Sequence, residues 1–337
     1  MAINDEPSNT LPKIKVSDRA AWLEALETER PVLIHLNADT TWLIQLPYPP
    51  SCTPPSGRRR FNILLDPWLK GPQTDVATWF STQWHVVESS VQTLDQLNSI
   101  LAGLEQGGGG PKVTNNSYID AVAISHEFTD HCHQATLREL PSSTPVIAPD
   151  KAARLVRSWK HFSSVITTPC FSSITESWKT DLSIAGLPSW IGIGRIATNG
   201  NAMYFHSAIM IAFDLGKAET ILYSPHGVQA SDLSCVRDCG LSTLALLHGL
   251  HDVRIWMTKQ LNLGAMNGIK AVCETGARYW IATHDEQKKG TGFIAPMLQR
   301  TRYTLKEAVD AEESRMKSKI PEYEFVELGS GDGVVLR

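Results

Sequence analysis

At positions 125–131 the chain has the sequence Ser125-His126-Glu127-Phe128-Thr129-Asp130-His131, directly after the apolar run Ile-Asp-Ala-Val-Ala-Ile at 119–124. The apolar run predicts a buried strand, and the polar stretch predicts the turn where this strand ends and a helix begins. Two histidines and an aspartate would then project from the sheet edge into one small volume. Imidazole and carboxylate groups crowded in this way are typical of a metal site.

The bulk composition is that of a folded protein without nucleic acid as its main partner. Of the 337 residues, 42% are hydrophobic and 20% are charged, which is enough apolar material for a large core. The 31 basic and 35 acidic residues leave a net charge of −4, which argues against a nucleic-acid-binding protein.

The compartment is expected to be the cytoplasm. Residues 1–7 have neither the basic start nor the apolar centre of a secretory signal. No apolar run approaches the roughly 20 residues that cross a bilayer, so no membrane partner is expected. The six cysteines are few for this length, and we expect them to be reduced.

Strand and helix patterns follow each other along the chain. We expect residues 1–16 to be a flexible segment and residues 17–337 to form a single domain, since no linker or change of composition divides them. Ser17 is the expected N-cap of a helix at 18–26. Strands are predicted at 31–36, 41–46, 61–66, 119–124, 202–213, 219–223, 243–247 and 279–283, and further helices at 91–104, 133–140, 150–158 and 265–273. This order favours one α/β domain with two packed sheets.

The histidines recur where the predicted strands end. Ligand crevices of α/β sheets lie outside the carboxyl ends of the strands, so this recurrence favours a common site. One further histidine lies within a strand region, and an acid ends another strand. The strand-end histidines are His126, His131, His226, His248 and His284, the histidine within a strand region is His206, and the acid is Asp66. Such ligands suit zinc, and also iron or manganese, and metal-assisted hydrolysis is the first reaction class to consider.

These residues resemble the signature of the metallo-β-lactamase superfamily. That signature is a strand-end Asp, then His-x-His-x-Asp-His, then a His, an Asp and a final His, each closing a strand. In that comparison Asp66 looks like the first element, His126, Asp130 and His131 like the second, His206 like the third, His226 like the position of the bridging Asp, and His284 like the last. The stretches 35–39 and 61–68 also look like a divergent branch common in fungi. The resemblance covers about residues 31–300 and implies an α/β fold of the αββα four-layer sandwich type.

The motif departs from this signature at two positions. Phe128 stands where the second histidine of the motif belongs, and His226 stands in place of the bridging aspartate. A normal dinuclear centre is therefore not expected. The resemblance instead implies one metal ion, with zinc as the first candidate, bound by Asp130, His131, His226 and His284. We assign His126, His206 and Asp66 to the catalytic group around that ion.

Two classes of function follow, with a third that is weaker. The first is a metal-dependent hydrolase that uses a metal-activated water on a small ester, lactone, thioester or amide. The second is a degenerate protein of the same fold that binds a metabolite or a protein partner in the cleft. The third is a nuclease, against which the net charge argues. Asp39 could orient a ligand histidine, and His248 could either line the pocket or be structural. The oligomeric state is not predicted.

Overall fold

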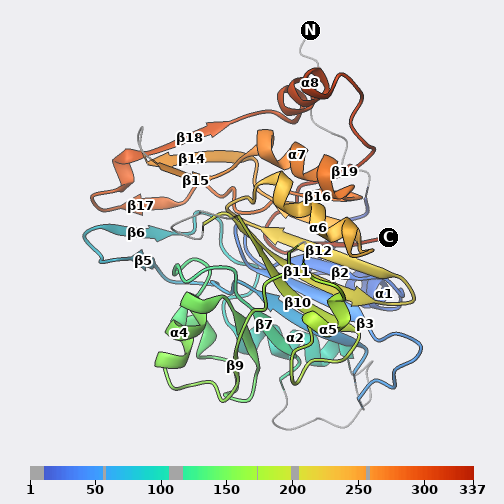
Figure 1. Cartoon of the computed structure of the whole chain (residues 1–337). Coiled ribbons are helices and arrows are strands. Elements are labelled where there is room, and N and C mark those ends of the chain that lie inside the picture. Colours follow the sequence, from blue (N-terminus) through green and yellow to red (C-terminus); the bar gives the residue numbers. More distant parts are fainter. Residues whose placement is uncertain (1–10, 56–57, 106–116, 173, 199–204, 256–258) are drawn as a thin grey trace.

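Two β-sheets form the centre of the fold (Figure 1). The structure is a computed structural model that describes residues 11–55, 58–105, 117–172, 174–198, 205–255 and 259–337. The first sheet contains, in spatial order, β1 (Ile14–Lys15), β20 (Asp332–Val335), β2 (Val32–His35), β3 (Trp42–Pro47), β4 (Arg60–Leu65), β7 (Ala121–Ala123), β8 (Val146–Ala148) and β9 (Val165–Thr167). The second contains β10 (Ile191–Ala197), β11 (Ser207–Asp214), β12 (Ala218–Ser224), β13 (Ser242–His248), β16 (Tyr279–Ile281) and β19 (Glu324–Val326).

Single strands supply side chains to two separate cores. In β11, Ile209 and Ile211 lie in the apolar cluster between the two sheets, while Met210 belongs to the cluster under the helices. In β4, Ile63 and Leu64 divide in the same way. Alternate side chains of a strand point to opposite faces, and here both faces are buried. This explains why the strands are nearly continuous apolar runs in the sequence.

Helices cover the outer face of each sheet, which confirms the predicted αββα sandwich. The helices packed on the first sheet are α1 (Arg19–Leu26), α2 (Leu94–Glu105), α3 (Gln134–Leu137) and α4 (Asp150–Ser158). Those on the second are α5 (Trp178–Asp181), α6 (Ser234–Asp238), α7 (Ala265–Thr275) and α8 (Leu305–Met316), with the 3₁₀ turn η1 (Ala230–Leu233). A second 3₁₀ turn, η2 (Ala295–Met297), buries none of its residues. Figure 1 shows α6, α7 and α8 on one side of the strands and α2 and α4 on the other.

Two small sheets extend from one side of the sandwich (Figure 1). One contains β5 (Gln73–Asp75), β6 (Ser81–Trp84) and β17 (Lys289–Thr291); the other contains β14 (His251–Ile255), β15 (Lys259–Asn262) and β18 (Leu298–Arg302). Neither sheet was predicted from the sequence. Their strands are short, and most of their residues are half-buried or exposed, so they lack the apolar alternation that marks a strand in a sequence.

The N-terminal boundary differs from the prediction in two details. Asp18, rather than Ser17, is the N-cap of α1, and its carboxylate accepts a hydrogen bond from the backbone N–H of Ala21 at 3.0 Å. Ordered structure begins before residue 17, because Ile14 and Lys15 pair with β20 at the other end of the chain. Among the described residues, no helix is both long and apolar enough to span a membrane.

Candidate metal centre

The predicted site residues gather at one edge of the sandwich, where strands of both sheets end. In the first sheet β4 and β7 are parallel, and in the second β12, β13 and β16 are parallel. The carboxyl ends of parallel strands meet at one edge. The residues that follow these strands are Asp66 after β4, His126, Asp130 and His131 after β7, His226 after β12 and His284 after β16.

Two of these residues have left-handed backbone conformations. The φ angle of Asp66 is +41° and that of His284 is +58°. Such angles are unfavourable for residues with a Cβ and persist only where neighbours hold them. Here the backbone N–H of Asp66 donates to the carbonyl of Ala123 at 3.1 Å, and that of His284 donates to the carbonyl of Asp39 at 2.9 Å. The chain is therefore fixed at the two points where it turns out of β4 and β16 into the site.

Two overlapping groups of buried side chains could hold a metal ion. His126, His131 and His226 form the first, and Asp130, His131 and His284 form the second; within each group the ligand atoms lie within 4.8 Å of one another. His131 belongs to both groups. The four ligands predicted from the sequence are thus brought close together, with His226 joined to the second group through His131.

Asp66 orients His131. The Nδ1 atom of His131 lies 2.6 Å from Oδ2 of Asp66, and because a carboxylate only accepts, this nitrogen carries a proton. Burial alone would lower the pKa of His131, but the charges of Asp130 and Asp66 outweigh it and the pKa is raised. Asp66 is itself held by the backbone N–H of Ser125 at 2.7 Å. Nε2 of His131 consequently points away from Asp66, toward the other ligands.

His226 faces His131 with its own Nε2 atom. The two Nε2 atoms are 3.0 Å apart, and Nδ1 of His226 lies 2.8 Å from the amide oxygen of Asn262, to which it donates. With both Nδ1 atoms protonated, two nitrogen lone pairs face each other, which is favourable only when a proton or a metal ion lies between them. Imidazoles held in this way by a carboxylate or an amide oxygen are typical metal ligands. The donor set therefore fits a metal ion.

Asp39 orients His284 as the sequence suggested. Nδ1 of His284 lies 3.0 Å from Oδ1 of Asp39, which leaves Nε2 for a ligand. Asp130 lies between the histidines: its Oδ1 is 3.6 Å from Nε2 of His131, and its Oδ2 is 4.0 Å from Nε2 of His284. Burial lowers the pKa of His284, although the charge of Asp39 opposes this.

Lys288 is a site residue that was not predicted from the sequence. Its ammonium lies 2.7 Å from Oδ2 of Asp39 and 2.8 Å from Oδ2 of Asp130, and its side chain is only 8% exposed. The ring of Trp68 lies 5.1 Å from the ammonium. Burial alone would lower the pKa of Lys288, but the two carboxylates outweigh it, so the pKa is raised and the amine is charged. In the sequence, the signal for Lys288 as a site residue was its position four residues after His284. A single lysine in a polar segment matches no motif, so this signal was not sufficient.

His126 is turned toward the backbone. Its Nε2 donates to the carbonyl oxygen of Phe205 at 2.9 Å, and its Nδ1 lies 2.8 Å from Oγ of Ser125. Burial, together with the charges of His131 and Arg195, holds the pKa of His126 well below its usual value. Binding a metal through Nε2 would require breaking the bond to Phe205. His126 is therefore a neutral imidazole at the margin of the centre.

Phe128 replaces a ligand with an aromatic wall. Its ring stacks on that of Phe205, with centroids 4.9 Å apart and an interplanar angle of 11°. The centroid of the His226 ring lies 6.1 Å from that of Phe128. This side of the centre is consequently apolar, which favours exclusion of water from the first ligand group.

His206 lies outside both ligand groups of the described residues. Its Nδ1 donates to the backbone carbonyl of His226 at 3.2 Å, and the residue is half-buried beside a different cavity that Gln229, Asn267 and Lys270 also line. Burial lowers its pKa. In this structure His206 supports the turn that carries His226.

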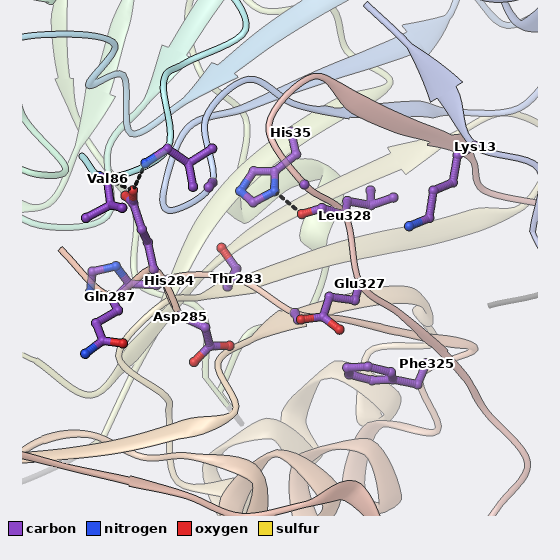
Figure 2. A pocket seen from close by; sticks show the side chains of 15 residues that line it. Lys13, His35, Val86, Thr283, His284, Asp285, Gln287, Phe325, Glu327 and Leu328 are labelled. Atoms are coloured by element: carbon purple, nitrogen blue, oxygen red, sulfur yellow. Dashed lines mark hydrogen bonds between the residues drawn. The ribbon is translucent and has the colours of Figure 1, made fainter. Parts of the chain in front are cut away.

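A cavity of about 600 Å³ adjoins the centre at His284 (Figure 2). Figure 2 shows His284 and Gln287 on one side of it and Leu328 and Glu327 on the other. Hydrogen bonds hold the segment that follows His284. The Asp285 carboxylate accepts from the backbone of Leu250 and His251, and burial raises its pKa to about 7; the Glu286 carboxylate accepts from the backbone of Val86 and Val87.

His248 is a structural residue rather than part of the centre. It is fully buried at the end of β13, where Nδ1 donates to the carbonyl of Gly249 at 2.8 Å and Nε2 accepts from the side-chain amide of Asn267 at 3.0 Å. Both ring nitrogens are satisfied in the neutral form. Burial lowers the pKa of His248 to about 4.

We therefore expect His248 to make the fold sensitive to acid. In the unfolded chain a histidine gains its proton near pH 6.5, whereas folded His248 gains it near pH 4, so this contribution to stability is complete above pH 6.5 and is lost as the pH falls toward 4. The loss is about 3 kcal/mol across that window. Urea unfolding at pH 7 and pH 5 should show a smaller pH effect in His248→Gln than in the wild type. An equal pH effect in both proteins would contradict this role.

Comparison with known proteins supports the fold. No protein-family model and no curated protein matches this chain. Solved structures with similar folds include a possible metal-dependent hydrolase from Veillonella parvula (14% identity, 91% of this chain and 100% of the other, TM-score 0.55) and a metallo hydrolase from Ignicoccus hospitalis (12%, 91% and 99%, 0.51). A third is the isothiocyanate hydrolase from Delia radicum gut bacteria (14%, 90% and 98%, 0.53). The chain has an αββα sandwich of the metallo-β-lactamase type.

Proposed function

We propose that this protein is a metal-dependent hydrolase that cleaves a small ester, lactone, thioester or amide. It would hold one divalent ion, for which zinc is the first candidate. The observation that carries the proposal is the convergence of buried imidazoles whose Nδ1 atoms are already fixed. His131, His226 and His284 are held by Asp66, Asn262 and Asp39 respectively. The cavity of about 600 Å³ that His284 lines, alone among the four proposed ligand residues, is large enough for a small substrate. We further propose that the protein acts in the cytoplasm.

Asp130, His131, His226 and His284 would hold the ion. When bound, it would lower the pKa of a coordinated water to about 7 and polarise a substrate carbonyl. The group formed by Asp130, His131 and His284 offers three ligands, the number found in many catalytic zinc sites, whereas four protein ligands usually make a closed site. Whether His226 completes the set therefore decides between an open and a closed centre.

The remaining site residues would act around the ligands. Asp66 keeps the His131 proton on Nδ1, and His206 supports the backbone at His226. His126, neutral and at the margin of the centre, is our candidate to accept a proton at Nδ1. The rings of Phe128 and Phe205 exclude water from that side.

A second candidate function is binding: the protein would have lost catalysis and would bind a metabolite or a protein partner. The bond between His126 Nε2 and Phe205 favours it, because that histidine is not turned toward a metal. Phe128 favours it too, since it supplies no ligand.

Metal analysis joined to a substrate panel tests the proposal. Protein purified without chelators should contain about one equivalent of a transition metal and should hydrolyse at least one member of an ester, lactone, thioester and amide panel. Removal of the metal should abolish turnover, and its return should restore it. A protein with only traces of metal, or a metal-loaded protein inactive on every compound class, would favour the binding function.

A further inference from the structure

The Lys288 ammonium lies beside Asp130, a member of the ligand group formed by Asp130, His131 and His284. It contacts Oδ2 of Asp130 at 2.8 Å and Oδ2 of Asp39 at 2.7 Å. Of the two carboxylate oxygens of Asp130, Oδ2 is thus paired with the ammonium, whereas Oδ1 lies on the side of His131, 3.6 Å from its Nε2 atom. Asp130 therefore shares its charge between Lys288 and any ion bound beside His131.

The residues before and after Lys288 in the sequence are both fixed by hydrogen bonds. Two residues before it, Glu286 accepts hydrogen bonds from the backbone of Val86 and Val87 at 2.7 and 2.9 Å and from His85 at 2.6 Å. Directly after it, β17 pairs with β6. A lysine anchored on both sides and 8% exposed is part of the centre rather than a surface side chain that reaches it by chance.

Charge balance limits the number of ions. Three buried carboxylates, those of Asp39, Asp66 and Asp130, face the imidazoles, and one ammonium is paired with two of them. With neutral imidazoles, one divalent cation brings the sum of these charges to zero. A second divalent cation would leave a buried excess of two positive charges, which is strongly unfavourable.

We propose that the Lys288 ammonium takes the place of a second metal ion, so that the centre binds one divalent cation. This inference rests on the proposed metal-dependent function. Lys288 acts as a positioning residue: it neutralises Asp39 and Asp130 and keeps Asp130 directed to one ion.

The experiment is a zinc titration of metal-free protein by calorimetry, with bound metal counted by mass spectrometry after gel filtration. The wild type should bind one equivalent. Lys288→Met removes the ammonium and should bind a second equivalent, whereas Lys288→Arg, which keeps the charge, should bind one. Lys289→Met, at the exposed neighbour in β17, is the matched control and should also bind one.

Foldedness is checked in each variant by circular dichroism. If Lys288→Met fails to fold, Lys288→Gln replaces it, because the amide retains donors for Asp39 and Asp130 without the charge. One equivalent in a folded neutral variant, at unchanged affinity, would overturn the role of Lys288 and leave the hydrolase proposal standing. Two equivalents in the wild type would overturn both the role of Lys288 and the single ion of the proposed function, and would leave metal-dependent hydrolysis standing. A wild type that binds no metal would instead overturn the proposed function itself.

Discussion

His131→Ala should lose its bound metal and its hydrolytic turnover together. His131 is the one residue common to both ligand groups of the described chain, so its removal damages every arrangement of ligands that the centre offers. His131 is fully buried, and its removal also leaves the buried carboxylate of Asp66 without its imidazole partner. Loss of the metal removes several kcal/mol of transition-state stabilisation, so we expect turnover to fall by about a thousandfold or more.

Metal content and turnover should be measured on the same preparation. Asp130→Ala should behave in the same way, because the second group would keep only two imidazoles. His161→Ala is the control: this histidine bonds to the backbone carbonyl of Leu140 at 2.8 Å, away from the centre, and its variant should keep metal and activity. An His131→Ala protein that retained one equivalent of metal and full turnover would show that the ligands have been assigned wrongly.

The fold could be predicted because its signals are local. An apolar run at 119–124 that ends in a polar turn becomes β7 and the turn after it. The same relation of strand to polar end recurs at Asp66, His226 and His284, and parallel strands bring such ends to one edge. Order along the chain, combined with the topology of parallel strands, therefore explains why these residues lie at one edge of the sandwich.

The residues that hold the ligands could not be predicted in the same way. Asn262 binds His226 from β15, a strand that the sequence did not reveal, and Phe205 binds His126 through its backbone carbonyl, which any residue possesses. Lys288 is recognised only when Asp39 and Asp130 are seen on either side of its ammonium. Such partners depend on tertiary packing, and no spacing rule in a single sequence encodes it.

Phe128 shows what a departure from a motif can and cannot reveal. The sequence indicates that a ligand is missing, because phenylalanine has no lone pair to give. It does not indicate what the ring does instead. In the structure the ring stacks on Phe205, whose carbonyl holds His126. The substitution and the orientation of His126 are therefore connected: the aromatic pair and the diverted imidazole lie on the same side of the centre.

Asp39→Ala should destabilise the fold and weaken metal binding at the same time. The Asp39 carboxylate is fully buried and contacts both Nδ1 of His284 and the ammonium of Lys288. Burial alone would raise its pKa, but the charges of His284 and Lys288 outweigh this and hold it well below its usual range. Its removal leaves a buried ammonium with Asp130 alone, which should cost about 3–5 kcal/mol of stability. It also frees the His284 ring, which should lower metal affinity by about 10–100-fold.

Asp39→Asn separates these two effects. The amide oxygen can still accept from Nδ1 of His284, so metal affinity should fall less than in Asp39→Ala, whereas the charge that balances Lys288 is lost in both variants. Denaturant unfolding of metal-free protein measures the first effect, and zinc titration measures the second. Asp238→Ala, an exposed carboxylate in α6, is the control and should change neither. If Asp39→Asn lost as much metal affinity as Asp39→Ala but kept the stability of the wild type, the carboxylate would matter for its charge on the metal and not for its pairing with Lys288. That result would also weaken the case for the lysine as the second cation of the centre, because both roles depend on the same buried ion pair.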